Sequence, residues 1–385
     1  MDRVAAMLLR ELDGRHGSRF APTLACPPYA ARASRVPGVG RSRFAVNLDR
    51  FVNRFWDYPR HLAPMADAFD LFHIVDHSYA QLAHMLPAHR TVVTCHDLDA
   101  FRSLVEPERE PRSRPFRWAT RRILTGLQRA ACVTFDTAAM RKEMTSRGLV
   151  REEKTVVAPP GVDDIFRAQP DDAAAAEAER LAPGGDASGS PGSPGRPGRV
   201  DVVHVGSTIS RKRIDVLLRV CGALRRTHPS LRLLRVGGPL TADQLAIARA
   251  AGIADRVVNI DHVSDATLAA LYRRAAVVLQ TSEREGFGLP VVEAIAAGTP
   301  VVASSIEALR EVGGDAVEYC GVADLDAWTR TVDALLRERR DEPDRWARRR
   351  ERGRVRAASF TWAAFADRIA DAYESLLAGA ARQIA

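Results

Sequence analysis

Short apolar segments alternate with helical segments along the C-terminal half of the chain, and this alternation restricts the fold more than any other feature. The residues expected in strands are 200–205, 231–236, 257–260, 277–280 and 301–303. Helical spacing of apolar residues predicts helices at 213–227, 242–251, 265–275 and 289–297. Continuous Val, Leu and Ile runs between helices are typical of parallel strands buried on both faces. This half therefore predicts a doubly wound α/β domain of the Rossmann type.

The N-terminal half shows a looser form of the same alternation. Strands are expected at residues 71–75, 90–94, 132–135 and 155–158 and helices at 117–131 and 137–147, whereas residues 20–60 give no clear pattern. An Ala-rich stretch from Asp171 leads into a segment dense in Gly and Pro that ends at Arg199, which predicts a linker or surface insertion. The predicted organisation is a Rossmann-like domain over residues 1–165, a linker or insertion over 166–199, a second Rossmann-like domain over 200–360 and an amphipathic C-terminal helix within 361–385.

Composition narrows the classes of partner. A chain of 385 residues can bury two separate cores. Residues 1–165 carry 25 Lys and Arg against 19 Asp and Glu, a net charge of +6 out of +8 for the chain. A basic half is compatible with an anionic membrane, a phosphorylated acceptor or nucleic acid, although free use of Arg would explain it equally well. Nucleic acid is not expected, because only 6% of residues are aromatic and no binding motif is present.

Cysteine and hydropathy patterns indicate the compartment. The five cysteines are scattered without paired spacing, which argues against disulfides or a zinc site and for a reducing cytoplasm. No apolar run approaches the roughly 20 residues of a membrane span, and the N-terminus lacks the apolar core of a secretion signal. The chain is therefore expected in the cytoplasm, with any membrane contact peripheral and at the inner face. Neither a metal nor a cofactor is predicted.

Two motifs carry the chemistry. In Glu285-Gly-Phe-Gly-Leu-Pro-Val-Val-Glu293, one carboxylate stands in a Gly-rich loop and the other one turn into a helix. The loop carboxylate can meet sugar hydroxyls, the helical one can meet a ribose, and free N–H groups at the helix start can hold an anion. In the second motif, a strand ends at Gly206 and the cations Arg211, Lys212 and Arg213 follow where a helix begins. Cations at a helix N-terminus oppose the helix dipole, which indicates an anion nearby.

The first motif closely resembles the Glu-x7-Glu signature of the retaining glycosyltransferases of family 4, which have the two-domain GT-B fold. The resemblance implies that Glu285 faces the donor sugar and that Glu293 binds the ribose. Backbone groups of the loop and helix start would also contact the donor, from Gly286, Phe287, Gly288 and Leu289. Lys212 matches the family's conserved pyrophosphate-binding lysine. In this family the C-terminal helix crosses back toward the first domain.

Weaker resemblances extend along the rest of the chain. Gly206 and Ser207 match the pyrophosphate turn, but the family often has Arg where Ser207 stands, so Arg211 is expected to supply the missing charge. Segments 236–239 and 260–264 resemble the turns beside the nucleobase, which assigns Gly238 and Val263 to donor binding. In the N-terminal half, His96 resembles the histidine that reaches the donor sugar or acceptor phosphate across the cleft, and it is predicted to be catalytic with Glu285. The segment that contains Asp76 and His77 resembles the acceptor-side loop.

One departure concerns the start of the chain. The family opens with a strand, a Gly-rich loop and a helix, whereas this sequence begins within a segment at residues 3–12 that resembles the helix. The N-terminal domain is therefore expected to lack its first strand. This would expose the edge of the neighbouring strand and remove one amide cradle facing the donor or acceptor.

The resemblance implies a metal-independent retaining glycosyltransferase that uses a nucleoside-diphosphate sugar. The acceptor would be a glycan or a lipid-linked glycan of cell-surface polysaccharide or glycolipid synthesis. No nucleophile is evident on the far face of the sugar, which favours front-side attack within a tight ion pair. The alternative hypothesis is a non-catalytic nucleotide-sugar-binding homologue in a polysaccharide assembly complex, motivated by Ser207 and the missing strand.

Overall fold

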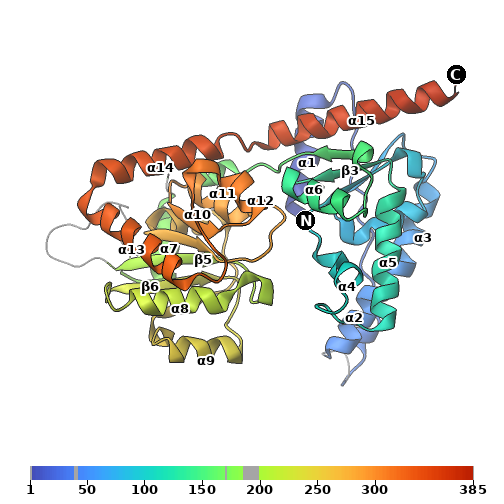
Figure 1. Cartoon of the computed structure of the whole chain (residues 1–385). Helices are drawn as coiled ribbons and strands as arrows, with labels where there is room; N and C mark the ends of the chain where they lie inside the picture. Colours follow the sequence, from blue (N-terminus) through green and yellow to red (C-terminus); the bar gives the residue numbers. More distant parts are fainter. Residues whose placement is uncertain (1, 39–41, 170, 185–198, 385) are drawn as a thin grey trace. The chain divides into compact units, whose positions relative to one another are not determined.

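The computed structural model describes residues 2–38, 42–169, 171–184 and 199–384, which form two compact units (Figure 1). Unit 1 comprises Met1–Pro160 together with Trp362–Ala385, and unit 2 comprises Gly161–Thr361. Each unit contains one parallel sheet. Within the described part of the chain, no helix has both the length and the apolar character needed to cross a bilayer.

The sheet of unit 2 has six strands in the order β10-β9-β8-β5-β6-β7, all parallel to their neighbours. The strands are β5 (Val200–Val205), β6 (Leu231–Val236), β7 (Val257–Ile260), β8 (Val277–Gln280), β9 (Val301–Ser304) and β10 (Glu318–Cys320). The chain adds β6 and β7 on one side of β5 and then β8 to β10 on the other, so the order reverses between β5 and β8. Such a switch point opens a crevice at the carboxyl ends of the strands. The predicted doubly wound domain is confirmed.

Helices cover both faces of this sheet (Figure 1). They are α8 (Ile214–Leu224), α9 (Ala242–Ala250), α10 (Asp265–Arg274), α11 (Leu289–Ala296), α12 (Glu307–Gly313), α13 (Leu325–Asp341) and α14 (Pro343–Ala357). Successive strand residues point to opposite faces: Val202 joins the core beneath α8 and α13, whereas Val203 joins the core beneath α10 and α11. This arrangement explains why most strand residues on both faces are apolar, instead of apolar and polar residues alternating.

The Ala-rich stretch expected to be linker is instead a helix of unit 2, α7 (Asp172–Leu181). Ala174, Ala178 and Ala182 are buried, and the carbonyl oxygens of Ala178 and Ala182 accept hydrogen bonds from Arg274 of α10. Alanine has the highest helix propensity, and its small side chain lets two helices approach closely, so a low-complexity stretch can still pack. The Gly- and Pro-rich part, residues 185–198, lies outside the described residues.

The sheet of unit 1 has four parallel strands in sequence order, β1-β2-β3-β4. These are β1 (Phe72–Ile74), β2 (Thr91–Cys95), β3 (Cys132–Phe135) and β4 (Thr155–Val157). Helices α1 (Asp2–His16) and α15 (Trp362–Ile384) pack on the face that Val92 enters. The face that Val93 enters is covered by the 3-10 segment η4 (His77–His84), α5 (Arg114–Arg129) and α6 (Ala138–Ser146). The helix expected at the start of the chain is therefore present as α1.

Much of the segment without a clear pattern is helical: α2 (Arg43–Val52), a π-helical turn η2 (Asn53–Asp57) and α3 (Tyr58–Leu62). The buried carboxylate of Asp49 accepts hydrogen bonds from the backbone N–H groups of residues 32–34 and from the Ser34 hydroxyl. These bonds, led by the one from Ser34, lower the pKa of Asp49 to about 2. A single carboxylate thus anchors the preceding loop to α2, an interaction without any periodic signal in the sequence.

Candidate functional site

The loops that follow β5 and β8 meet at the switch point of unit 2. Gly206 ends the β5 turn with φ +154°, and a Cβ there would lie 3.3 Å from Cε1 of His204 and 3.5 Å from Cε of Lys212. The hydroxyl of Thr281, directly after β8, donates a hydrogen bond of 2.9 Å to the carbonyl oxygen of Lys212. The β8 loop thereby holds Lys212 in place beside the turn.

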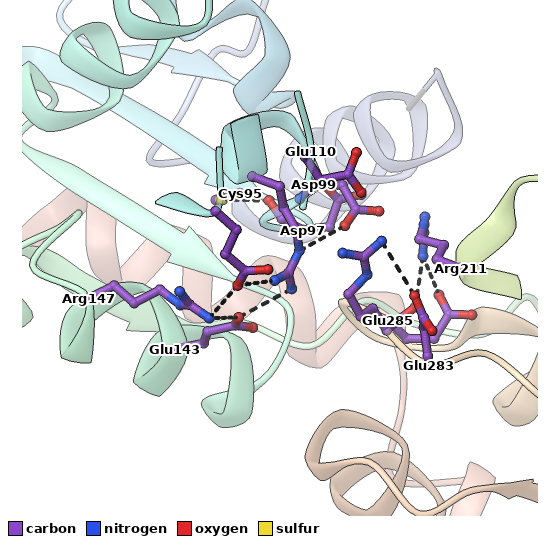
Figure 2. A network of polar contacts seen from close by, with 12 residues as sticks. Cys95, Asp97, Asp99, Glu110, Glu143, Arg147, Arg211, Glu283 and Glu285 are labelled. Carbon is purple, nitrogen blue, oxygen red and sulfur yellow. Dashed lines mark hydrogen bonds and ion pairs between the residues drawn. The ribbon is translucent and has the colours of Figure 1, made fainter. Parts of the chain in front are cut away.

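Glu285 and Lys212 form the central ion pair of this site. Nζ of Lys212 lies 2.5 Å from Oε1 of Glu285, and both side chains are about nine-tenths buried. Nη1 of Arg211 lies 3.2 Å from Oε2 of the same carboxylate (Figure 2), and Nε2 of Gln280 donates to Oε1 at 2.6 Å. The structure therefore brings together Gly206, Arg211, Lys212 and Glu285, which the sequence places in two separate motifs.

The ionisation of Glu285 follows from this surrounding. Burial raises the pKa of the carboxyl, but the Lys212 ammonium, a hydrogen bond from Ser282 and the Arg211 guanidinium together outweigh burial and lower the pKa below its ordinary value. Glu285 is consequently anionic at neutral pH. A carboxylate in this state can stabilise positive charge or accept hydrogen bonds from hydroxyls, but it cannot donate a proton.

The three consecutive cations of the motif have different partners. Arg211 is tied to the β8 loop, because it also donates to the carbonyl oxygen of Arg284. Arg213 adopts the left-handed conformation at φ 47° and pairs with Asp215 at 2.9 Å, away from Glu285. Arg211 is expected to supply the positive charge missing at Ser207. Its ion pair with Glu285 competes with that role. Ser207 itself is exposed.

The start of α11 is shaped by a glycine. Gly288, at φ +102°, caps the helix, and a Cβ there would lie 2.5 Å from Cδ2 of Leu309. Gly286 and Phe287 before it are buried, whereas Leu289 is partly exposed. The helix N-terminus carries free N–H groups and a positive partial charge.

Glu293 lies one turn into α11 and is 6% exposed. Its Oε2 accepts a hydrogen bond of 3.1 Å from the hydroxyl of the buried Tyr272. Burial and the nearby Glu293 carboxylate both raise the pKa of Tyr272, so this hydroxyl stays protonated and keeps donating. The contact fixes one oxygen of Glu293 within the unit.

The predicted base-side residues lie at the ends of β6 and β7. Gly238 has φ +93°, and its carbonyl oxygen accepts a hydrogen bond from the guanidinium of Arg235. Val263 is partly buried against the core that also contains Phe287. Three polar strand residues of unit 2, His204, Arg235 and Gln280, are fully buried and were missed by sequence reasoning. His204 and Arg235 stand between apolar neighbours, and a polar residue within such a segment was the available signal, whereas Gln280 ends β8 and gave no such signal.

In unit 1, the predicted histidines gather at the carboxyl ends of β1 and β2. Nδ1 of His96 lies 2.8 Å from Oδ2 of Asp136, Nε2 of His96 lies 2.8 Å from the carbonyl oxygen of Val75, and the backbone N–H of His96 donates to Nδ1 of His77. Asp76 accepts from the backbone N–H of Ser78 and caps η4. Both ring nitrogens of His96 are thus engaged within this unit, which sequence reasoning did not foresee.

These partners fix the charge of His96. Burial lowers its pKa, but Asp136 and the carbonyl of Val75 outweigh burial and raise the pKa to about 9. The ring is therefore an imidazolium at neutral pH and donates from both nitrogens. Burial lowers the pKa of the neighbouring His77, which stays neutral and accepts from His96 at Nδ1.

Carboxylates follow β2 as an Asp-x-Asp pair, Asp97 and Asp99. The buried Arg102 joins this loop to α6 through Asp99 and Glu143, and Arg147 pairs with the same Glu143 (Figure 2). Across the described ranges, no three His, Cys, Asp or Glu side chains are placed to hold a metal ion.

Two protein-family models match the chain. The model of the glycosyl transferases group 1 matches residues 192–353, and the model of glycosyltransferase family 4 matches residues 1–165.

Curated relatives match over shorter stretches. The D-inositol 3-phosphate glycosyltransferase of Nocardia farcinica is 34% identical over 231 residues, 57% of this chain and 47% of the relative. The MMP alpha-(1->4)-mannosyltransferase of Mycolicibacterium hassiacum is 34% identical over 183 residues, 46% of this chain and 40% of the relative. The chain spans about half the length of the curated relatives it matches.

Solved structures share the fold. Sucrose-phosphate synthase from Thermosynechococcus elongatus superimposes with a TM-score of 0.65 at 23% identity, covering 91% of this chain and 83% of that one. Anabaena HepE in complex with UDP-glucose gives a TM-score of 0.65 at 17% identity, covering 84% of each chain. These likenesses show a common GT-B architecture.

The charge of His96 leads to a pH prediction. Because its folded pKa of about 9 lies above the ordinary 6.5, its contribution to stability is complete below pH 6.5 and is lost as pH rises through 9. We expect the Cε1–H resonance of His96 to titrate near pH 9 in the wild type, and Asp136→Asn to move that midpoint below 6.5, because burial then dominates. The loss in unfolding free energy between pH 6.5 and 9 should be on the order of 2–3 kcal/mol larger in the wild type than in the variant. A wild-type midpoint at or below 6.5 would contradict the assignment.

Proposed function

The chain belongs to the glycosyltransferases of group 1 and family 4, and we propose that it transfers a sugar from a nucleoside-diphosphate sugar to a glycan or lipid-linked acceptor with retention and without a metal. The observation that carries this proposal is the buried Lys212–Glu285 ion pair at the switch point of unit 2. The Lys212 ammonium is suited to a diphosphate, and the Glu285 carboxylate is suited to a sugar. Anabaena HepE was crystallised with UDP-glucose, which supports a donor of this class.

The donor is assigned to unit 2 piece by piece. The pyrophosphate lies on the Gly206 turn, the exposed Ser207 and Lys212, with Arg211 beside them. The ribose meets Glu293, and the base meets backbone near Gly238 and Val263. The loop from Gly286 to Gly288 and the start of α11 at Leu289 face the donor with backbone N–H groups and the positive end of the helix dipole. His96, Asp76 and His77 remain predictions for the sugar and acceptor side.

Lys212 and Glu285 act together during transfer. A departing diphosphate gains negative charge, which the fixed Lys212 ammonium stabilises, while the sugar gains positive charge, which the Glu285 carboxylate stabilises. The lowered pKa of Glu285 fits this role and does not fit a general acid. Front-side attack within the resulting ion pair gives retention without a covalent sugar ester.

Binding of the free diphosphate tests the phosphate assignment. We expect one of UDP, GDP and ADP to bind in isothermal titration, and Lys212→Ala to weaken that binding about tenfold or more, because a buried charge-assisted contact is lost. Arg213→Asn is the matched control: asparagine tolerates the left-handed conformation, and Arg213 pairs with Asp215 instead. An unchanged diphosphate affinity in Lys212→Ala would contradict the assignment of Lys212 to the phosphates.

Turnover separates the enzyme from a binding homologue. We expect Glu285→Gln to lower kcat by about 10²-fold or more while changing nucleotide affinity little, because the lost charge acts mainly in the transition state. Glu283→Gln, in the same loop, should keep most of the activity. Equal losses of kcat and affinity would contradict the role of Glu285. Donor binding without any transfer by the wild type would favour the non-catalytic homologue.

We further propose that unit 1 contacts an anionic membrane through one exposed surface. Phe44, Leu48 and Phe51 share a face of α2, and their exposed fractions are 74%, 41% and 44%. Ring contacts extend this face. The ring centroids of Phe51 and Phe55 are 4.8 Å apart, and those of Phe55 and Trp118 of α5 are 6.0 Å apart. We call this group of five residues the aromatic stripe.

The positive charge beside the aromatic stripe indicates that its partner is anionic. Helix α5 contains five arginines and no carboxylate, and Arg114, Arg121 and Arg122 lie one turn from the exposed Trp118. Aromatic side chains flanked by arginine are suited to the interface of an anionic bilayer, where the rings enter the headgroup region and the cations meet phosphates. A lipid-linked acceptor would lie in such a bilayer.

Vesicle binding tests this surface. We expect the chain to sediment with phosphatidylcholine vesicles that contain phosphatidylglycerol, to bind pure phosphatidylcholine at least about tenfold more weakly, and to dissociate as salt rises. The double change Phe51→Ser and Trp118→Ser should abolish sedimentation, while Val355→Ser, an exposed apolar residue of unit 2, should not. A concentration-dependent dimer that the double variant abolishes, without vesicle binding, would overturn the membrane assignment.

A further inference from the structure

Arg235, on β6 of unit 2, is a buried cation with an unusual set of partners. Its side chain is fully buried, and its guanidinium donates to the carbonyl oxygens of Gly206, at 2.9 Å, and Gly238. Within the described part of the chain, no carboxylate pairs with it. Burial lowers the pKa of Arg235, with no opposing carboxylate to raise it.

Three other buried arginines of unit 2 have carboxylate partners. Arg232, on the same strand, and Arg274 share the buried Asp201, and Arg349 pairs with Glu338. Burying a charged side chain without a counter-charge is costly. Proteins therefore keep such a side chain mainly where a ligand or partner of opposite charge binds beside it. The position of Arg235 between two glycine turns at the carboxyl edge of the sheet indicates where that partner would sit.

The hydrogen bond to Gly206 also sets the direction of a peptide group. Peptide bonds are planar and, in the described residues, trans, so the N–H of Ser207 points opposite to the Gly206 carbonyl. Because that carbonyl is directed inward to Arg235, the N–H of the exposed Ser207 is directed outward. None of the described groups accepts a hydrogen bond from it. The turn of β6 is held against the same peptide, since a Cβ at Gly237 would lie 2.3 Å from the Gly206 oxygen.

The surroundings keep this region positive. His204 is the cross-strand register partner of Arg235 and lies beside Gly206. Burial, Arg235 and Lys212 lower the pKa of His204 to about 3, so its ring is neutral at physiological pH. Lys212 contributes a second cation next to Gly206, and although Lys212 and Arg211 both pair with Glu285, this one carboxylate does not neutralise both cations.

We propose that Arg235 is a positioning residue of the diphosphate subsite, where it fixes the Gly206–Ser207 peptide with its N–H outward and adds buried positive charge beneath it. The inference rests on the proposed function, because it assigns a nucleoside diphosphate to this turn. It explains how a chain with Ser207 in place of a phosphate-binding arginine still presents a hydrogen-bond donor, the Ser207 N–H, and a cation, Arg235, to the diphosphate. The charge comes from the neighbouring strand instead of the loop.

Comparing the binding of a charged diphosphate with that of the uncharged nucleoside distinguishes this role of Arg235 from a merely structural one. We would first identify which of UDP, GDP and ADP binds the wild type, and then measure that diphosphate by isothermal titration and the matching nucleoside by ligand-observed NMR. Arg235→Gln should weaken the diphosphate about tenfold more than the nucleoside, because the Gly206–Ser207 peptide and the added charge act on the phosphates, whereas only the bond to Gly238 lies on the base side. Arg235→Lys, which keeps the charge and one donor, should recover most of the diphosphate affinity.

Arg232→Gln is the matched control, since it removes a buried arginine from the same strand but at Asp201, away from the turns. It should lower the melting temperature without changing the ratio of the two affinities. Equal weakening of nucleoside and diphosphate in folded Arg235→Gln, or no weakening of either, would overturn the role of Arg235 alone. If Arg235→Gln does not fold, Arg235→Lys decides in the same way: equal loss of both ligands overturns the role. A folded wild type that binds none of the three diphosphates would overturn the proposed function and this inference with it.

Discussion

The ion pair between Lys212 and Glu285 is the interaction on which the site of unit 2 depends. It joins the loop after β5 to the loop after β8 across the switch point, and each loop comes from a different half of the doubly wound sheet. Two charges this deeply buried are stable only when further hydrogen bonds satisfy them. Gln280 and Arg211 provide those bonds to Glu285. The pair therefore fixes the geometry of both loops and the ionisation of the carboxylate at once.

Sheet topology explains why so much of this region could be predicted from the sequence. Strands β5 to β9 are mostly apolar segments, and glycines or polar residues follow them directly, so strand ends and loop motifs can be located together. Parallel strands then bring their carboxyl ends to one edge. Together with the family resemblance, this topology allows Gly206, Lys212 and Glu285 to be assigned to one site from the sequence. In unit 1 the same logic placed His77 and His96 at neighbouring strand ends.

The parts that could not be predicted share a physical cause, which is that contacts across the fold override local pattern. Ala174 and Ala178 belong to a sequence of low complexity, yet α7 packs because α10 lies against it. Arg235 occupies a strand position between Leu234 and Val236, and its partners are carbonyl groups, which no sequence motif encodes.

The carboxyl edges of the two sheets differ in sign, and this difference favours unit 2 for an anion. In unit 2, Arg235 and Lys212 flank Gly206, His204 is neutral, and the carboxylate of Glu285 is shared by Lys212 and Arg211, so cations are in excess. In unit 1, the imidazolium of His96 stands among the carboxyl groups of Asp76, Asp97 and Asp136. An excess of acidic groups repels a diphosphate but accepts hydrogen bonds from hydroxyls. On electrostatic grounds, the edge of unit 2 is better suited to phosphates, and the edge of unit 1 to a hydroxyl-rich, uncharged ligand.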